Sequence, residues 1–261
     1  MPTDRWLLCP RPLSEAPWRL FCFPHAGAGT SSYVAWSAEL APDIEVTAVC
    51  PPGRERHIGA LPHHAMAPLI DALLPVIRPR LRPPYAFFGH SLGALVAFAL
   101  ALALEQEGSG PERLLVSSAV PPHLPKHGPR VGRLDDDGLI SKVASYHGFP
   151  PGLSESPELL RLVLPALRAD IGIAETYSVA EGTRVRSPIT AFGGLGDAGV
   201  PPHVLTGWRA LTHGPFGLSL LPGGHFYLTA QRPSLLSAIR LDLGILGAQA
   251  FAGNQRIEAS R

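Results

Sequence analysis

Residues 85–98 read YAFFGHSLGALVAF, and the remainder of the chain is arranged around them. The first four residues are a short apolar run that predicts a buried strand. From Leu92 to Leu104 good helix formers follow one another with almost no polar side chain, which predicts a buried helix. Between the two lies the pattern Gly-x-Ser-x-Gly at 89–93. Because strand, sharp turn and helix are the context in which this pattern presents a nucleophile, Ser91 is the candidate, and a plain turn serine is the alternative.

The two glycines of this pattern have a steric reason to be there. Gly89 and Gly93 are expected where strand and helix approach closely, because a Cβ at either position would collide with the neighbouring element. The turn is also expected to hold Ser91 in a strained backbone conformation, which lifts its hydroxyl clear of the sheet.

Two strand–loop units precede the serine. The apolar run 18–23 predicts a central strand, and the glycine-rich loop HAGAG follows it at 25–29. The β-branched run 45–50 predicts a second strand, which leads into the polar loop PPGRERH at 51–57. Two interpretations stay open for the charged residues at 54–56: a solvated loop with local ion pairs, or a lining at the mouth of the site.

Apolar runs after the serine predict three further strands, at 113–118, 187–193 and 216–221. Such near-continuous runs are typical of a parallel sheet covered on both faces. Helices are predicted at 31–40, 65–77, 203–212 and 227–243, with Pro75 expected to end or kink the second of them. Alternating strands and helices predict an α/β fold with an open, mostly parallel central sheet flanked by helices.

The character of the chain changes between residues 119 and 186. A proline-rich exit leads to two amphipathic helices, predicted at 135–145 and 156–169, and no strand is evident between them. We interpret 119–186 as a helical lid insertion that covers the nucleophile, excludes water and shapes the pocket.

The remaining boundaries follow from this division. The core comprises 18–118 and 187–247. A proline-rich leader, 1–17, is expected to be irregular apart from a possible edge strand at 6–8. The polar tail, 248–261, is expected to be disordered.

A serine hydroxyl needs a base to take its proton and a carboxylate to orient that base. Asp197 follows the strand at 187–193, and His225 follows the strand at 216–221 through a Gly-Gly loop. Parallel strands bring their carboxyl ends to one edge of a sheet, so Ser91, Asp197 and His225 are expected to meet there. The chain order serine, acid, histidine is the order found in an α/β-hydrolase.

Both supporting roles have rival residues. Asp170 is expected at the end of a lid helix, and the acidic run 135–137 is typical of a helix N-terminus. His90 lies inside the turn and is expected to point away from the site. His25 flanks the glycine-rich loop; contact with the substrate is one interpretation, and a structural role is the one we expect.

Two backbone N–H groups are candidates for an oxyanion hole. The N–H of Leu92 follows the nucleophile and opens a helix, so the helix dipole adds a positive field there. The second candidate is the N–H of Ala26, in the loop after the strand at 18–23; an ordinary strand-to-helix turn is the alternative for that loop.

Composition excludes several classes of function. The formal net charge is +1 and no basic run has interleaved aromatics, which argues against nucleic acid or an anionic membrane as partner. No apolar stretch is long enough to span a bilayer, and no signal peptide is evident. Three cysteines without metal-ligand spacing predict reduced thiols and a cytoplasmic location. No metal cluster, phosphate-binding loop or dinucleotide fingerprint occurs, so we expect neither metal nor cofactor.

Several stretches between about Leu20 and Leu236 resemble the discrete type II thioesterases that accompany polyketide synthases and nonribosomal peptide synthetases. These stretches are FCFPHAGAG, PPGRERH, FFGHSLGALVAFALA, LRADI..AETY, GW..LT.GPF and LPGGHFYL. The resemblance implies an α/β-hydrolase fold, a triad of Ser91, Asp197 and His225, and oxyanion donors at Ala26 and Leu92. It also implies an editing role, in which stalled or incorrect acyl groups are hydrolysed from the phosphopantetheine arm of acyl or peptidyl carrier proteins. We expect a monomer that acts on such carriers.

Two places depart from the family pattern. The first glycine-rich loop reads AGAG where a second consecutive glycine is commoner, and Ala-Gly follows Asp197 where the family usually has proline. Three other functions stay open: a carboxylesterase or lipase on free esters, an excised chain-terminating or cyclising thioesterase domain, and a non-catalytic binder of carrier proteins. The motifs outside the triad favour the editing thioesterase.

Overall fold

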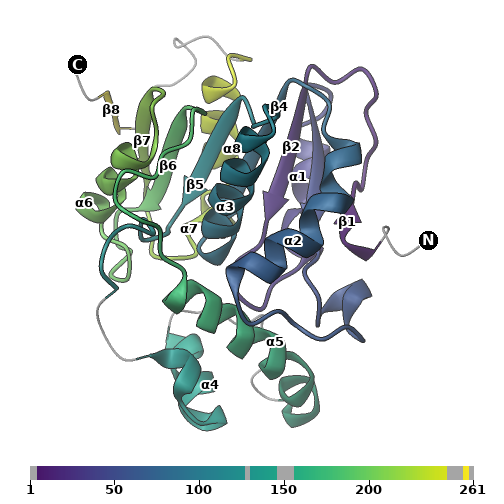
Figure 1. Cartoon of the computed structure of the whole chain (residues 1–261), viewed down its shortest axis with the longest axis vertical. Helices are drawn as coiled ribbons and strands as arrows, with labels where there is room; N and C mark the ends of the chain where they lie inside the picture. Colours follow the sequence, from purple (N-terminus) through teal and green to yellow (C-terminus); the bar gives the residue numbers. More distant parts are fainter. Residues whose placement is uncertain (1–4, 127–129, 146–155, 246–254, 259–261) are drawn as a thin grey trace.

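The computed structural model describes residues 5–126, 130–145, 156–245 and 255–258 (Figure 1). Within these ranges the chain forms one eight-stranded sheet of order β1-β3-β2-β4-β5-β6-β7-β8. The inner strands pair in parallel, while β1 and β8 pair antiparallel at the two edges. The strands are β1 Leu7–Leu8, β2 Trp18–Phe23, β3 Ile44–Val49, β4 Tyr85–His90, β5 Arg113–Ser117, β6 Ile189–Gly194, β7 Phe216–Leu221 and β8 Gln255–Glu258. The predicted α/β fold with a mostly parallel sheet is confirmed.

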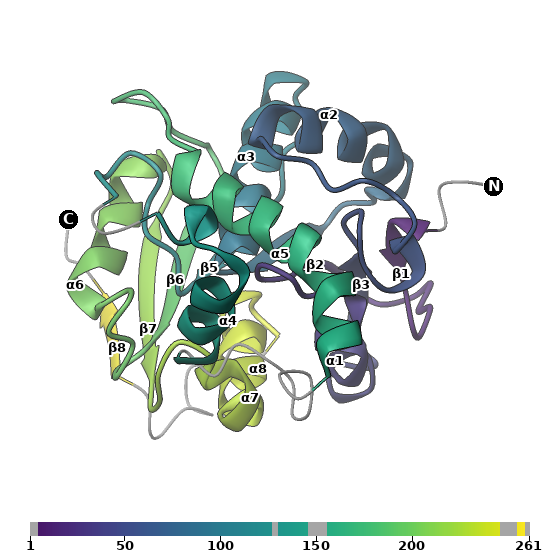
Figure 2. The same cartoon turned by 90° about the horizontal axis from the view of Figure 1, so that it is seen from below.

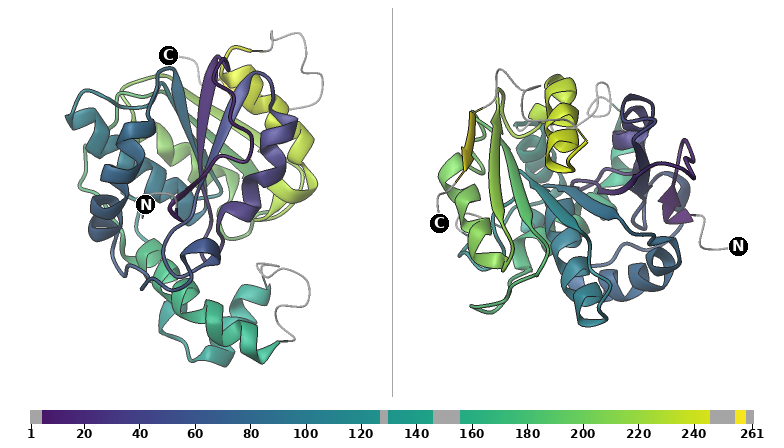
Figure 3. Two further views of the ribbon diagram at one scale, coloured as in Figure 1. Left: turned by 90° about the vertical axis from the view of Figure 1, so that its right-hand side faces the viewer. Right: turned by 90° about the horizontal axis from the view of Figure 1, so that it is seen from above.

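Helices cover both faces of the sheet (Figure 3). One face carries α2 Met66–Ile77, α3 Leu92–Gln106 and α6 Pro202–Leu205, and the other carries α1 Val34–Glu39, α7 Tyr227–Ala230 and α8 Arg232–Asp242. Along β2, Phe21 and Phe23 pack into the first layer and Leu20 and Cys22 into the second. Because successive strand residues point to opposite faces, a strand covered on both sides must be apolar throughout, as the sequence showed.

The parallel register sets where the site forms. Phe23 at the end of β2 pairs with Gly89 near the end of β4, and His90 pairs with Ser117 of β5. Gly194 pairs with Leu221 at the ends of β6 and β7. The loops that follow β2, β4, β6 and β7 therefore leave the sheet on the same side, at the carboxyl ends of the parallel strands.

Two helices lie across that edge (Figures 1 and 2). They are α4 Asp136–Ser145 and α5 Pro157–Thr176, and they share an apolar cluster of Leu139, Leu160, Leu164 and Leu167 with Ala26 packed against it. The predicted helices are present, but α5 continues seven residues past the expected end at Ala169. The physical reason is that Asp170, which looks like a polar stop in the sequence, is buried inside the helix and has a cationic partner.

Other boundaries differ from expectation. α2 continues beyond Pro75 to Ile77, whose side chain is fully buried and gives the last turn a packing reason. The helix expected at 227–243 is divided into α7 and α8. The prediction of a disordered tail is wrong for Gln255–Glu258, which form β8 against the edge of β7; the other tail residues after 247 lie outside the described ranges.

Candidate active site

Ser91 sits on the sharp turn between β4 and α3. Its backbone has φ 55° and ψ −118°, a conformation rarely adopted by a residue with a side chain. A Cβ at Gly93 would lie 2.0 Å from the carbonyl oxygen of Phe23, and one at Gly89 would lie 2.1 Å from that of Gly93. Strand and helix therefore approach as closely as the sequence predicted, and only glycine fits at either position.

The loops after β6 and β7 bring an acid to a histidine. Nδ1 of His225 lies 2.8 Å from Oδ2 of Asp197. The other carboxylate oxygen, Oδ1, accepts hydrogen bonds from the backbone N–H groups of Gly199 at 3.0 Å and Val200 at 3.1 Å. The Ala-Gly sequence after the acid thus contributes a donor that fixes the carboxylate.

Asp197 is almost completely buried, with 3% of its surface exposed. Burial by itself would raise the pKa of Asp197, but the hydrogen bond and charge of His225, together with the backbone N–H of Val200 and the side chain of Ser118, outweigh burial and hold that pKa below its ordinary value. The carboxylate is therefore ionised at neutral pH, as it must be to orient an imidazole and stabilise its protonated form.

Ser91, Ala26 and His225 line one cavity of about 180 Å³. The body of the protein also contributes His25 and Phe226 to its wall. The remaining lining residues come from the lid segment, and they are Val131, Val143, Leu167, Ile171 and Glu175. This segment thus supplies a mostly apolar wall to the cavity that holds the candidate nucleophile and base.

Leu92 is the first residue of α3, and its side chain is buried in the core. The first N–H groups of a helix have no acceptor within the helix, so this N–H has the character that an oxyanion donor needs. Ala26 lies beside Ser91 in the lining of the cavity. The structure thus brings together the predicted nucleophile, acid, base and oxyanion loop.

The rival acid has a different partner. Asp170 forms a buried bidentate ion pair with Arg54, whose Nη2 lies 3.0 Å from Oδ1 of Asp170. Of the two interpretations of the loop at 51–57, solvation is wrong for Arg54, which is only 4% exposed. Sequence reasoning missed this pair, although PPGRERH and LRADI both stood among the motifs of the resemblance.

The family model described as Thioesterase domain matches residues 18–243. The chain belongs to the thioesterase family.

Similar proteins extend this assignment. Gramicidin S biosynthesis protein GrsT of Aneurinibacillus migulanus is 34% identical over 234 residues, which cover 89% of this thioesterase and 91% of GrsT. Thioesterase PikA5 of Streptomyces venezuelae is 37% identical over 228 residues, covering 87% and 81% of the two chains. The solved structure of type II thioesterase BorB from the borrelidin biosynthetic cluster superposes with a TM-score of 0.84 at 38% identity, covering 90% and 96%. The predicted type II thioesterase, a hydrolytic enzyme of α/β-hydrolase fold, is confirmed.

One further histidine of the thioesterase, His90, lies against His225, and His25 lies against His90. The ring of His90 is 5.2 Å from that of His225 and 5.8 Å from that of His25, measured between centroids. The expectation that His90 points away from the site is therefore wrong: it is fully buried beneath the base, where its Nδ1 lies 2.9 Å from Oγ of Ser117. Burial, together with the charge of His225, lowers the pKa of His25 to about 4 and that of His90 well below its ordinary value. Both rings are neutral at pH 7, so neither repels a protonated His225.

These neutral histidines predict a loss of stability in mild acid. The pKa of His25 is about 4 in the folded chain against 6.5 when exposed, so between these pH values the unfolded chain binds more protons and the free energy of unfolding falls as pH falls. For His25, which keeps partial solvent contact, we expect a loss on the order of 1 kcal/mol from pH 7 to pH 5. Urea denaturation of the wild type and His25→Gln at both pH values measures it. An equal loss in the two proteins would contradict the prediction.

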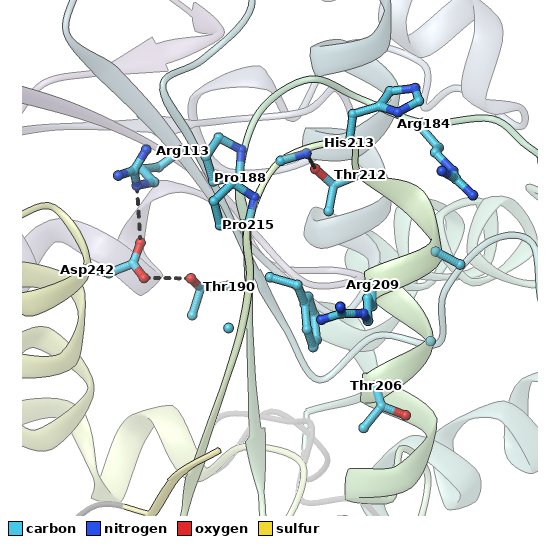
Figure 4. A pocket seen from close by; sticks show the side chains of 15 residues that line it. Arg113, Arg184, Pro188, Thr190, Thr206, Arg209, Thr212, His213, Pro215 and Asp242 are labelled. Atoms are coloured by element: carbon cyan, nitrogen blue, oxygen red, sulfur yellow. Dashed lines mark hydrogen bonds and ion pairs between the residues drawn. The ribbon is translucent and has the colours of Figure 1, made fainter. Parts of the chain in front are cut away.

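A larger cavity, of about 940 Å³, lies at the other end of the parallel strands, where β5 and β7 begin (Figure 4). Its lining includes Arg113 at the start of β5 and Phe216 at the start of β7, and Asp242 bridges Arg113 and Thr190. The candidate nucleophile, acid and base are absent from its lining. The smaller cavity is therefore the candidate active site.

Two properties of the described part of the thioesterase bear on other functions. Within residues 5–126, 130–145, 156–245 and 255–258, none of the helices is long and apolar enough to cross a membrane. The His, Cys, Asp and Glu side chains of the same ranges form no group of three or more that could hold a metal ion.

Proposed function

We propose that this type II thioesterase hydrolyses acyl groups from the phosphopantetheine arm of acyl or peptidyl carrier proteins, and so removes stalled or incorrect acyl groups during polyketide or nonribosomal peptide synthesis. The observation that carries the proposal is a serine and a histidine sharing an apolar, lid-covered cavity, with the histidine held by a buried carboxylate. The similarity to GrsT, PikA5 and BorB supports the biosynthetic setting.

The chemistry proceeds through an acyl-enzyme. Oγ of Ser91 attacks the thioester carbonyl while Nε2 of His225 accepts its proton, and the N–H groups of Ala26 and Leu92 stabilise the oxyanion. His225 then gives the proton to the departing thiol. Water, deprotonated by the same histidine, attacks the ester at Ser91 and releases the acid. Asp197 holds the imidazole tautomer throughout.

The volume of the cavity bears on acyl size. About 180 Å³ is small beside the ~300–1,000 Å³ of typical ligand pockets. With α4 and α5 in their present position the cavity favours a short acyl group over a long one.

Substrate class is tested by comparing one acyl group in two carriers. We expect kcat/KM for an acyl-phosphopantetheinyl carrier protein to exceed that for the p-nitrophenyl ester of the same acid by about tenfold or more, because remote binding energy on the carrier is used at the reacting centre. A series of acyl lengths on the same carrier shows the size limit. Equal or faster turnover of the oxygen ester would identify a carboxylesterase instead.

We further propose a cytoplasmic location. Cys9, Cys22 and Cys50 are free thiols, and the latter two are buried. Unpaired buried cysteines are typical of proteins from reducing compartments. The monomeric state expected from the sequence stays a prediction.

A further inference from the structure

The glycine-rich loop that carries Ala26 is held on its far side by charged residues. The N–H of Gly27 donates to Oδ2 of Asp170 at 2.8 Å, and Nη1 of Arg54 donates to the carbonyl oxygen of Ala28 at 3.1 Å. Since Arg54 and Asp170 also bind each other, the two residues that follow Ala26 are fixed to a single buried unit.

The guanidinium of Arg54 is itself anchored. Its Nε and Nη2 donate to the carbonyl oxygen of Pro52 at 3.3 and 3.1 Å, and the side chains of Arg54 and Asp170 are each only 5% exposed. The guanidinium of arginine offers five N–H donors in a rigid planar fork and can reach all of these acceptors at once, which the single ammonium of a lysine could not do.

A second contact continues the attachment along the loop. The carboxylate of Glu55 accepts from the N–H groups of Thr30 at 2.7 Å and Ser31 at 3.0 Å. It also accepts from the hydroxyl of each of these residues. The polar loop at 51–57 therefore holds the glycine-rich loop at two points, directly after Ala26 and at residues 30–31.

The lid helix takes part through the same pair. Asp170 belongs to α5, and Leu167 lies one turn before it. Leu167 packs on Gly27, because a Cβ added to Gly27 would lie only 3.0 Å from Cδ1 of Leu167. Leu167 and Ile171 also line the cavity beside Ser91. The helix that closes the cavity is thus the helix that fixes the loop of the second oxyanion donor.

We propose that Arg54 and Asp170 are positioning residues for catalysis: their buried ion pair fixes the N–H of Ala26 in the oxyanion hole and makes its position depend on the seating of α5. The proposal rests on the proposed function in one respect, the assignment of Ala26 as a donor. When α5 is displaced, Asp170 leaves Gly27, and the oxyanion hole loosens at the same time as the cavity opens.

A double variant, Arg54→Met with Asp170→Leu, tests the pair. It removes both charges together, so no unpaired charge is left buried, and apolar replacement of a buried ion pair is commonly tolerated. The substrate is an acyl-N-acetylcysteamine thioester, which needs no carrier protein. We expect kcat to fall about 10- to 100-fold, a loss similar to or below that from deleting an oxyanion donor, with KM changed less than about threefold.

Inhibition by an alkyl trifluoromethyl ketone distinguishes a positioning role from a merely structural one, because a structural role would leave the inhibition constant unchanged. The adduct of the ketone with Ser91 bears an oxyanion, so we expect the inhibition constant to rise by the same factor as kcat/KM falls. A folded double variant with unchanged kcat, or one that loses kcat but binds the ketone as the wild type does, would overturn the proposal.

A control and a second variant keep the test decisive. Asp136→Asn removes the charge of the exposed pair that Asp136 forms with Arg168 of α5, and should leave kcat within about twofold. If the double variant does not fold, Arg54→Lys replaces it: charge is kept but the fork is lost, and an unchanged kcat would overturn the proposal. Because the thioester is carrier-free, failure of the carrier assignment would leave this result standing, and inactivity of the wild type toward it would instead refute the proposed chemistry.

Discussion

Ser91→Ala is expected to lower kcat for thioester hydrolysis by about 10⁶-fold while leaving the fold intact. Alanine keeps the Cβ, so the sharp turn between β4 and α3 loses only the hydroxyl. Without Oγ no acyl-enzyme forms, and the base and oxyanion hole can assist only direct attack by water. A site that lacks its nucleophile still accelerates the reaction over the uncatalysed rate in water, but this remaining acceleration is small beside the fall in kcat.

The measurement is release of acid from a loaded carrier protein, together with labelling by a fluorophosphonate. The wild type should be labelled and Ser91→Ala should not. Ser37→Ala is a control that removes a serine hydroxyl elsewhere, because Ser37 is buried on α1 and donates to the carbonyl oxygen of Val34. Turnover by Ser91→Ala comparable with that of the control would remove Ser91 as the nucleophile.

Asp197→Asn is expected to cost about 10⁴-fold in kcat. Asparagine can keep the hydrogen bonds from Gly199 and Val200 through its oxygen, which turns its NH₂ toward His225. Nδ1 must then accept a hydrogen bond, so the proton moves to Nε2 and the imidazole can no longer take a proton from Ser91. The variant therefore keeps the position of the His225 ring but holds the ring in the wrong tautomer.

Steady-state kinetics of three acid variants tests this assignment. Asp137→Asn, at the start of α4, serves as the control and should retain activity within about twofold. Asp170→Asn should lose less than Asp197→Asn, since Asp170 contacts the glycine-rich loop and has Arg54 as its ionic partner. A larger loss of kcat in Asp170→Asn than in Asp197→Asn would make Asp170 the catalytic acid and disprove the assignment of Asp197.

The sequence was most informative where structure depends on neighbours along the chain. The run at 85–98 predicted strand, turn and helix because burial on both faces demands continuous apolar residues. Gly89 is dictated by a backbone contact within the same unit, and Gly93 by the backbone of Phe23 on the neighbouring strand β2. Asp197 and His225 could be placed because each follows a strand, and parallel strands end at one edge of the sheet.

Features that depend on distant packing could not be predicted. Arg54 and Asp170 lie 116 positions apart, and only the docking of α5 on the polar loop makes a buried pair of them. Taken singly, an arginine in a polar loop and an aspartate near a helix end are each expected in solvent. The strand Gln255–Glu258 is mostly polar, and its conformation comes from pairing with the edge of β7. His90 was misplaced because its environment depends on where His225 returns to the sheet.

The backbone at Ser91 limits how this protein can be improved. A positive φ of 55° is held at a cost on the order of 1–3 kcal/mol for a residue with a side chain, and glycine would relieve much of it. Thermostability and turnover therefore make opposite demands on this one position. Laboratory evolution that screens only for heat resistance will favour the inactive glycine, so each round of selection must also require product.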